Sequence, residues 1–246
     1  KLSVNVNAVA YLRNRRELPW PDPVALARIA LEAGARGITI HPRPDERHIR
    51  RTDVGALATM MRDRFPDRDL TLEGYPDDEF LSLVEAAHPQ QVLFVPDAPD
   101  QVTSDHGWNL DDHADRVAPA METARSLGAA VSLFIDPEPH MAERAAVLGA
   151  QRIEIFTGPY GACHADRVRA DAELQRVVRC AEAARDAGLG VNAGHDLTLD
   201  NLEGVVERIP FIREVSIGHA FVACALEVGF REAVLRFRRA LGEANV

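Results

Sequence analysis

A cluster of imidazole and guanidinium groups follows a short apolar run near the start of the chain. The run at residues 38–40 leads directly into His41 and Arg43, and Arg47 and His48 come a few residues later. Histidine transfers protons near neutral pH, and arginine forms planar, two-pronged hydrogen bonds to phosphate or carboxylate. We therefore predict that a strand ends here and that its end handles a small anionic molecule.

The elements that carry this stretch alternate in type along the chain. Eight short runs rich in Val, Ile and Leu are separated by segments in which apolar residues recur at helical spacing. Such alternation is typical of parallel strands joined by right-handed crossovers. Eight units in 246 residues fit a closed barrel, which takes about 250 residues. No GxGxxG follows the first run, so a dinucleotide-binding fold is disfavoured. The prediction is an α/β protein, a single (β/α)8 TIM barrel domain over residues 1–246, with strands at 2–8, 37–41, 69–73, 91–96, 130–136, 152–156, 190–194 and 214–218.

In such a barrel the carboxyl ends of all the strands open onto one mouth. The residues at these ends include two carboxylates and three imidazoles, a combination that predicts acid/base chemistry with several proton transfers. The candidates, in chain order, are Asn5, Asn7, His41, Arg43, Glu73, Glu154, Thr157, Asn192, Gly194, His195, Ser216, Gly218 and His219.

Three of these side chains also have a purely structural interpretation. A loop carbonyl could hold His41, and a neighbouring arginine could pair with Glu73. Glu154 lies between two isoleucines of one strand, so it faces the barrel lumen, where an acid is costly unless it is paired or used. Structural and catalytic roles both stay open for it.

Two separate parts of the mouth have features that suit anions. The seventh and eighth strands end in Gly-His-Asp (194–196) and Gly-His-Ala (218–220), each running into a helix, and barrels often bind phosphate there through backbone N–H groups. Arg43, Arg47 and His48 could hold a second anion across the mouth. We therefore expect two phosphorylated substrates or one bisphosphate. A segment at 97–110, rich in Asp, Pro, Gly and Ser, is predicted to be a functional loop.

The overall charge argues against nucleic acid as a partner. The formal net charge is −10, yet nine arginines stand against five acids between residues 13 and 51. A local basic field on an acidic protein suits a small anionic ligand better than a polyanion.

The cysteine pattern and the apolar runs bear on the cellular compartment. Three widely spaced cysteines without a CxxC pair disfavour a disulfide framework and a structural zinc site, and they fit a reducing cytoplasm. No apolar run approaches the ~20 residues of a membrane helix, and the first residues lack the apolar core of a secretory leader. We expect a cytoplasmic protein that does not enter a membrane.

Taken in order, these segments resemble the pyridoxine 5′-phosphate synthase family nearly from end to end. The segments that carry the resemblance are at 4–16, 37–49, 72–73, 93–96, 131–136, 153–158, 191–195 and 217–219. The resemblance implies a (β/α)8 barrel with extra helices that assembles as dimers and octamers. It also implies condensation of 1-deoxy-D-xylulose 5-phosphate with 3-amino-2-oxopropyl phosphate, with release of phosphate and water, and no metal or organic cofactor.

The resemblance also implies a role for each site residue. His41 and Glu73 would accept protons, His195 would donate one, and Glu154 would be an accessory acid in the lumen. The aminoketone phosphate would be held by Asn5, Arg16, Gly218, His219 and the backbone just after His195, at Asp196. The deoxyxylulose phosphate would be held by Arg43, His48 and Thr103.

The chain departs from the family pattern at two places. The family's first strand commonly reads Asn-x-Asp-His, whereas this chain has Asn7 and Ala8 in place of the last two residues. Asn7 can still hydrogen-bond to the sugar phosphate, but Ala8 cannot. Asp196 stands where glycine is frequent, and its backbone N–H could still bind phosphate although its charge is unfavourable.

Two rival functions stay open at this point. One is a metal-dependent aldolase or isomerase with His41, Glu73, Glu154 and His195 as ligands, although four residues on four separate strands do not require a metal. The other is a non-catalytic phosphate-binding barrel, in which the changes at Asn7 and Ala8 abolish turnover. The oligomeric state, the order of proton transfers and the subunit in which Arg16 acts are left open.

Overall fold

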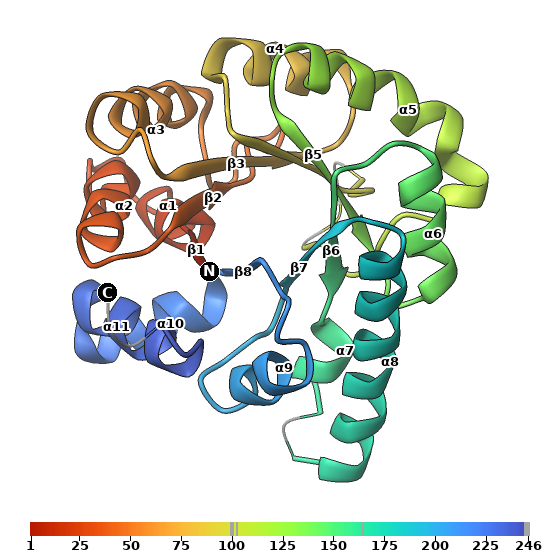
Figure 1. Ribbon diagram of the computed structural model, residues 1–246. Helices are drawn as coiled ribbons and strands as arrows, with labels where there is room; N and C mark the ends of the chain where they lie inside the picture. Colours follow the sequence, from red (N-terminus) through yellow and green to blue (C-terminus); the bar gives the residue numbers. More distant parts are fainter. Residues whose placement is uncertain (99–100, 102, 164, 244–246) are drawn as a thin grey trace.

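The computed structural model describes residues 1–98, 101, 103–163 and 165–243, in which a ring of parallel strands is surrounded by helices (Figure 1). Each strand pairs with the next in the chain, and β8 pairs with β1, so the barrel is closed as predicted. The strands are β1 (Leu2–Asn5), β2 (Gly37–Ile40), β3 (Asp69–Gly74), β4 (Gln91–Phe94), β5 (Ala130–Ile135), β6 (Arg152–Phe156), β7 (Gly190–Gly194) and β8 (Glu214–Ile217).

Helices follow the strands around the outside of the ring (Figure 1). Several begin at a side chain that accepts an otherwise unpaired backbone N–H: Asp22 accepts from Val24, and Asp77 accepts from Phe80. The helices are α1 (Asn7–Arg13), α2 (Pro23–Glu32), α3 (Arg51–Arg64), α4 (Asp78–Ala87), α5 (Leu110–Ser126), α6 (Pro139–Val147), α7 (Gly158–Gly161), α8 (Arg167–Asp186), α9 (Leu202–Arg208), α10 (His219–Val228) and α11 (Phe230–Ala240).

Within the described ranges, each helix is too short or too polar to cross a lipid bilayer.

The predicted first strand is wrong at its end. It was expected to reach residue 8, but β1 stops at Asn5 and α1 begins at Asn7. The side-chain Oδ1 of Asn5 accepts the backbone N–H of Asn7 at 2.9 Å, which turns the chain out of the strand. Val9 and Ala10 are then buried on the inner face of a helix, so tertiary packing overrides the strand-like alternation.

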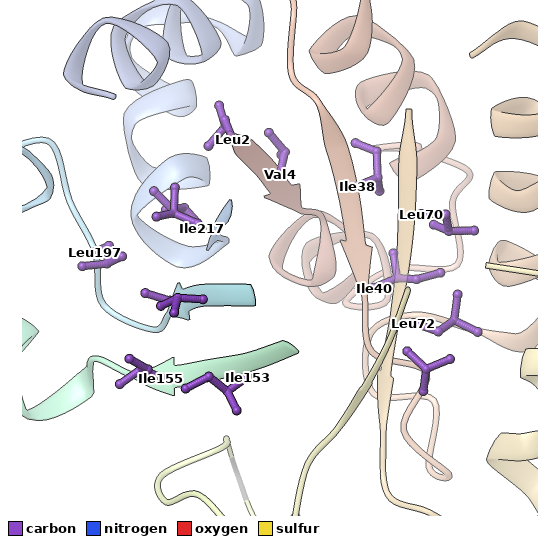
Figure 2. Close-up of a cluster of buried hydrophobic side chains, with 14 of the residues drawn as sticks. Leu2, Val4, Ile38, Ile40, Leu70, Leu72, Ile153, Ile155, Leu197 and Ile217 are labelled. Carbon is purple, nitrogen blue, oxygen red and sulfur yellow. The ribbon is translucent and has the colours of Figure 1, made fainter. Parts of the chain in front are cut away.

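The core between strands and helices follows from the alternation of side chains along each strand. Ile38 and Ile40 of β2 lie beside Leu70 and Leu72 of β3, and all four are buried (Figure 2). Successive strand residues point to opposite faces, so Thr39 points into the lumen. Each strand therefore contributes apolar residues to the outer core and polar ones to the lumen.

The inner face of the barrel is unusually polar below the mouth. The hydroxyls of Ser3 and Thr39 lie 2.7 Å apart, and the Gln91 amide donates to Thr71 at 3.2 Å. The Arg152 guanidinium donates to the side-chain oxygen of Gln91, Oε1, at 2.7 Å. These hydrogen bonds satisfy polar groups that are buried in the lumen.

Candidate active site

A cavity of about 770 Å³ opens at the carboxyl ends of the strands. It collects residues from segments far apart in the sequence, because parallel strands of a barrel end at one face. A smaller cavity of about 340 Å³ adjoins it at His41 and Arg43. The predicted site residues that line the larger cavity are Asn5, Asn7, His41, Arg43, His48, Glu73, Thr103, Glu154, His195, Asp196, Ser216, Gly218 and His219.

His41 and Glu73 face each other at the mouth, both nearly buried. The Nδ1 atom of His41 lies 3.2 Å from Oε1 of Glu73. Burial alone would raise the pKa of Glu73, but the charge and hydrogen bond of His41, with His195 and Arg43 near it, lower that pKa to about 2. Glu73 is therefore ionised at neutral pH and can only accept, so Nδ1 of His41 carries a proton and Nε2 is left for the substrate.

His48 is held as a neutral donor. The backbone N–H of Ile49 donates to Nδ1 of His48 at 2.9 Å. Burial and the nearby His41, Arg43 and Arg47 lower the pKa of His48 to about 3, although Glu73 opposes them. Its single proton must then lie on Nε2, because Nδ1 is an acceptor. The centroids of the His41 and His48 rings are 5.9 Å apart. Their hydrogen bonds give the two rings opposite tautomers, with the proton on Nδ1 in His41 and on Nε2 in His48.

Two asparagines at the end of β1 support this pair. Asn5 accepts from the backbone of Asn7, and Asn7 in turn accepts the backbone N–H of His41 at 2.9 Å. Asn7 was predicted as a substrate ligand, and its Oδ1 instead fixes the chain at the end of β2. Its amide N–H₂ group is the part that remains for a ligand in the cavity.

Arg43 is already engaged by the protein itself. Its guanidinium forms a buried ion pair with Asp97 and donates to the Gln101 carbonyl at 2.9 Å. The Ser104 hydroxyl donates to the same Asp97 oxygen at 2.6 Å, and the other oxygen, Oδ1, is buried with no hydrogen-bond partner among the described residues. The acid at the start of the predicted functional loop therefore orients the arginine expected to hold phosphate. Sequence reasoning missed Asp97, although an acid directly after the fourth strand was a signal for it.

The other arginines of the basic stretch are largely paired as well. Arg13 binds Asp53 through two buried bonds of 2.6 and 2.9 Å, and Arg47 contacts Asp45 at 2.8 Å. Arg16 is exposed just after α1 and does not line the cavity. The predicted candidates Thr157, Asn192 and Gly194 do not line it either, because they are buried within or beside their strands. The local basic field is thus made mostly of oriented ion pairs. Residues 99, 100 and 102 of the predicted loop lie outside the described residues.

Glu154 points into the lumen, as the alternation of β6 predicts. Its carboxyl is buried, and burial together with the charges of Glu73 and Glu214 raises its pKa well above the ordinary value. Both effects favour the protonated form of Glu154. A Cβ placed on Gly194 would lie only 2.2 Å from Oε1 of Glu154, so a side chain at that position would displace the acid.

His195 and Asp196 follow β7 in an unusual backbone conformation. Their φ values are 77° and 55°, in the left-handed region that costs a non-glycine residue about 1–2 kcal/mol. The His195 ring packs against Phe134 and Phe156, with ring centroids 5.2 and 5.5 Å away. The imidazole thus rests on an apolar wall and borders the cavity.

The end of β8 leads into the N-terminus of α10. Gly218 precedes the helix and His219 is its first residue. A Cβ on Gly218 would lie 3.2 Å from Asn5, which leaves little room for any other residue there. The first N–H groups of a helix lack intrahelical partners and attract anions, so this end of the cavity suits a phosphate group.

The metal-dependent rival finds no support in the geometry. Across the described ranges, no three His, Cys, Asp or Glu side chains stand together as a set that could hold a metal ion. His41 and Glu73 pair with each other instead.

Comparison with known proteins identifies relatives over nearly the whole chain. The family model described as "Pyridoxal phosphate biosynthesis protein PdxJ" matches residues 2–243. The pyridoxine 5′-phosphate synthase of Chelativorans sp. (strain BNC1) is 53% identical over 239 residues, which is 96% of each chain. The enzyme of the same name from Brucella anthropi is 52% identical over 241 residues, or 98% of each chain.

More distant solved structures share the fold alone. A tryptophan synthase α-subunit from Pyrococcus furiosus has a TM-score of 0.64 at 15% identity, covering 99% of this chain and 96% of that one. A protein from Aquifex aeolicus has a TM-score of 0.66, also at 15% identity, covering 98% and 92%. These likenesses support the barrel and carry no inference about activity.

Proposed function

The chain belongs to the PdxJ family of pyridoxal phosphate biosynthesis proteins and is an enzyme that makes pyridoxine 5′-phosphate. From this premise we propose that the cavity at the barrel mouth is its active site. The substrates are phosphorylated small molecules, 1-deoxy-D-xylulose 5-phosphate and 3-amino-2-oxopropyl phosphate. They condense to pyridoxine 5′-phosphate with release of phosphate and water. An amine must add to a ketone, water and phosphate must leave, and a carbon–carbon bond must close the ring.

The observation that carries this assignment is a pair of carboxyl groups with opposite pKa shifts in one cavity. Glu73 has a lowered pKa and is ionised, whereas the raised pKa of Glu154 favours its protonated form. Neighbouring acids whose pKa values are pushed apart are typical of sites in which one accepts and the other donates a proton. A reaction with several proton transfers requires such a division of roles.

Each step can be given to a residue on this basis. Ionised Glu73 orients His41 so that Nε2 accepts a proton from the bound intermediate, and Glu73 is itself a second acceptor. His195, which follows β7, donates a proton to the departing oxygen. Protonated Glu154 lies deeper in the lumen and serves as the accessory acid. The contacts of His41 and the burial of Glu154 support these roles.

Two ends of the cavity suit the two phosphate groups. The aminoketone phosphate fits beside Asn5, Gly218 and His219, where the N-terminus of α10 supplies N–H donors. The deoxyxylulose phosphate fits across the mouth beside Arg43, His48 and Thr103. His48 contributes one N–H rather than a charge, because its lowered pKa keeps it neutral.

We also propose that the enzyme is a homo-oligomer in which Arg16 reaches a neighbouring site. Arg16 is exposed and absent from the lining of its own cavity. Large apolar side chains stand exposed near it, with Tyr11 at 47% and Trp20 at 63% exposure, and such surfaces often mark interfaces. Light scattering of the purified protein tests this proposal, and a monomer at micromolar concentration would contradict it.

A cytoplasmic location is proposed on the cysteines. All three are free: Cys163 and Cys180 are buried, and Cys224 is partly exposed. Free thiols of this kind persist in a reducing compartment.

The direct test is to incubate the purified chain with both substrates and no added metal. We expect pyridoxine 5′-phosphate and inorganic phosphate in equal amounts by chromatography, and no product when either substrate is omitted. Tight binding of substrate without a pyridinol product would favour the non-catalytic barrel. Loss of activity to a chelator, together with stoichiometric bound metal, would favour the metal-dependent rival.

A further inference from the structure

The turn that presents His195 is held in place by a residue on the neighbouring strand end. His195 and Asp196 both have positive φ values, although neither is glycine. A backbone in this conformation persists only where its surroundings hold it there. The contacts around the turn therefore identify what positions the imidazole.

Thr157 makes the contacts that bear on both sides of the His195 α-carbon. Its hydroxyl lies 2.6 Å from the carbonyl oxygen of Gly194 and 2.6 Å from that of His195. Its backbone N–H also donates to the Gly194 carbonyl, at 2.9 Å. The side chain is fully buried where β6 ends, so water does not compete for these bonds.

These two carbonyls belong to the peptide planes before and after His195. A hydroxyl has a single proton, so Thr157 donates to the two carbonyls as one shared, bifurcated hydrogen bond. The rotations of the two peptide planes about the α-carbon are φ and ψ of His195, so this shared bond helps to set the direction of the Cα–Cβ bond. In a trans peptide the N–H points opposite to the C=O. The same hydroxyl therefore also sets the directions of the N–H groups of His195 and Asp196.

Other contacts hold the turn at different points. Phe134 and Phe156 pack against the ring, and the Asn201 amide donates to the Asp196 carbonyl at 3.0 Å. A Cβ on Gly161 would lie 2.4 Å from the Cβ of Asp196, so that glycine leaves room for the turn. These contacts leave the carbonyl oxygens of Gly194 and His195 to Thr157.

We propose that Thr157 is a positioning residue for the reaction, whose hydroxyl aims the His195 imidazole at the departing group and the adjacent N–H groups at the aminoketone phosphate. The role of His195 on which this rests comes from the proposed function. Thr157 itself acts through His195 and does not touch the substrate.

Two substitutions at one position isolate the hydroxyl. Thr157→Val keeps the shape of the side chain and removes the donor, whereas Thr157→Ser keeps the donor and removes a methyl group. We expect Thr157→Val to lower kcat at least about tenfold, because displacement of a catalytic group by a fraction of an ångström has effects of this size. The KM for the aminoketone phosphate should rise severalfold while the KM for the deoxyxylulose phosphate stays unchanged. Thr157→Ser should retain most of the activity.

A matched control separates positioning from general loss of a buried hydroxyl. Thr71 is also a buried threonine of the barrel, and its hydroxyl accepts from Gln91 at 3.2 Å, away from the His195 turn. Thr71→Val should keep both KM values and nearly all of kcat. Equal losses in the two valine variants would contradict the proposal.

An NMR measurement on the ligand-free protein tests Thr157 independently of turnover. The imidazole Cε1–Hε1 signal of His195, assigned by its absence in His195→Gln, should move or broaden in Thr157→Val and stay in place in Thr157→Ser. An unchanged His195 signal with unchanged kinetics would overturn the role of Thr157. Failure of the unaltered protein to form product would overturn the proposed function instead, and the NMR comparison would still decide whether Thr157 positions the imidazole.

Discussion

The Nδ1 atom of His41 and the Oε1 atom of Glu73 lie 3.2 Å apart across the ends of two adjacent strands, β2 and β3. Because the pKa of Glu73 is lowered to about 2, its carboxylate accepts from Nδ1 over the physiological range and turns Nε2 to the cavity. The arrangement is the histidine–carboxylate pair by which many enzymes set the tautomer of a base. In the proposed function the two residues act as one unit.

Substitution of Glu73 by glutamine should inactivate the enzyme without unfolding it. Glutamine offers no anionic acceptor, so His41 loses the group that sets its tautomer, and kcat should fall by about 10²–10⁴. Steady-state kinetics with circular dichroism measure both effects. Glu85→Gln, on the exposed face of α4, is the matched control and should be indistinguishable from the unaltered enzyme. Glu73→Gln with ordinary kcat would rule out the unit.

The raised pKa of Glu154 predicts how activity depends on pH. Only its protonated form donates, so kcat should fall as the pH rises through that raised pKa. Glutamine at this position stays neutral at every pH, so the decline of kcat at alkaline pH should weaken in Glu154→Gln. The variant should also have a lower kcat, because an amide does not donate its proton as a carboxylic acid does. A pH profile of the variant with the same alkaline limb would contradict this origin.

The free energy of unfolding should also depend on pH through Glu154, and the raised pKa of Glu154 fixes the direction of that dependence. The folded-state pKa of Glu154 is raised, so the stability contributed by its protonated form is complete below the unfolded-state pKa of about 4.3 and is lost as the pH rises toward the folded-state value. The free energy of unfolding of Glu154→Gln relative to the unaltered protein should therefore increase from pH 4 to pH 8. Urea unfolding at several pH values measures it, and a difference independent of pH would show that the fold does not raise the pKa of Glu154.

The Arg43–Asp97 ion pair should reveal itself through stability and through ligand binding. Its side chains are only 4% and 2% exposed, so Asp97→Asn leaves a buried guanidinium without its counter-charge and should cost roughly 3 kcal/mol of unfolding free energy. A bound phosphate group can replace that charge. The deoxyxylulose phosphate should therefore stabilise the variant more than it stabilises the unaltered protein.

Thermal unfolding with and without this substrate checks the prediction. Asp45→Asn is the control, because the Asp45–Arg47 pair is partly exposed and such pairs contribute at most about 1 kcal/mol. Equal stabilisation of both variants by substrate would indicate that Arg43 does not bind its phosphate.

We expect the barrel to unfold as a single domain. β1 and β8 pair with each other and close one ring, and one large apolar cluster extends from Leu2 to Leu241. The small second cluster, at Leu93, Val95, Phe134 and Phe156, belongs to β4, β5, β6 and the residues after them within the same ring. Urea transitions followed by circular dichroism and by the fluorescence of buried Trp108 should coincide. Two separate transitions would contradict a single folding unit.

Much of the fold can be predicted from the amino-acid sequence alone. The alternation of apolar runs and helical patterns predicted the closed barrel, because the right-handed crossover leaves few other arrangements for eight such units. The flanking isoleucines placed Glu154 in the lumen by the two-residue period of a strand. The first strand was misjudged beyond Asn5, since the turn there depends on one side-chain hydrogen bond that no periodicity reveals.

By itself, the sequence determined the barrel and which strand ends carry imidazole and carboxyl groups, because these follow from local periodicity and residue type. The family followed from the resemblance of its segments, in order, to a known family. Only the tertiary structure decided how these groups are paired, protonated and oriented. Three relationships join residues that lie about 40 to 80 positions apart or on separate strands. They are the pairing of Arg43 with Asp97, the opposite pKa shifts of Glu73 and Glu154, and the hydrogen bonds of Thr157 to the His195 turn. Burial and neighbouring charge set protonation, and both exist only once the chain has closed into a ring.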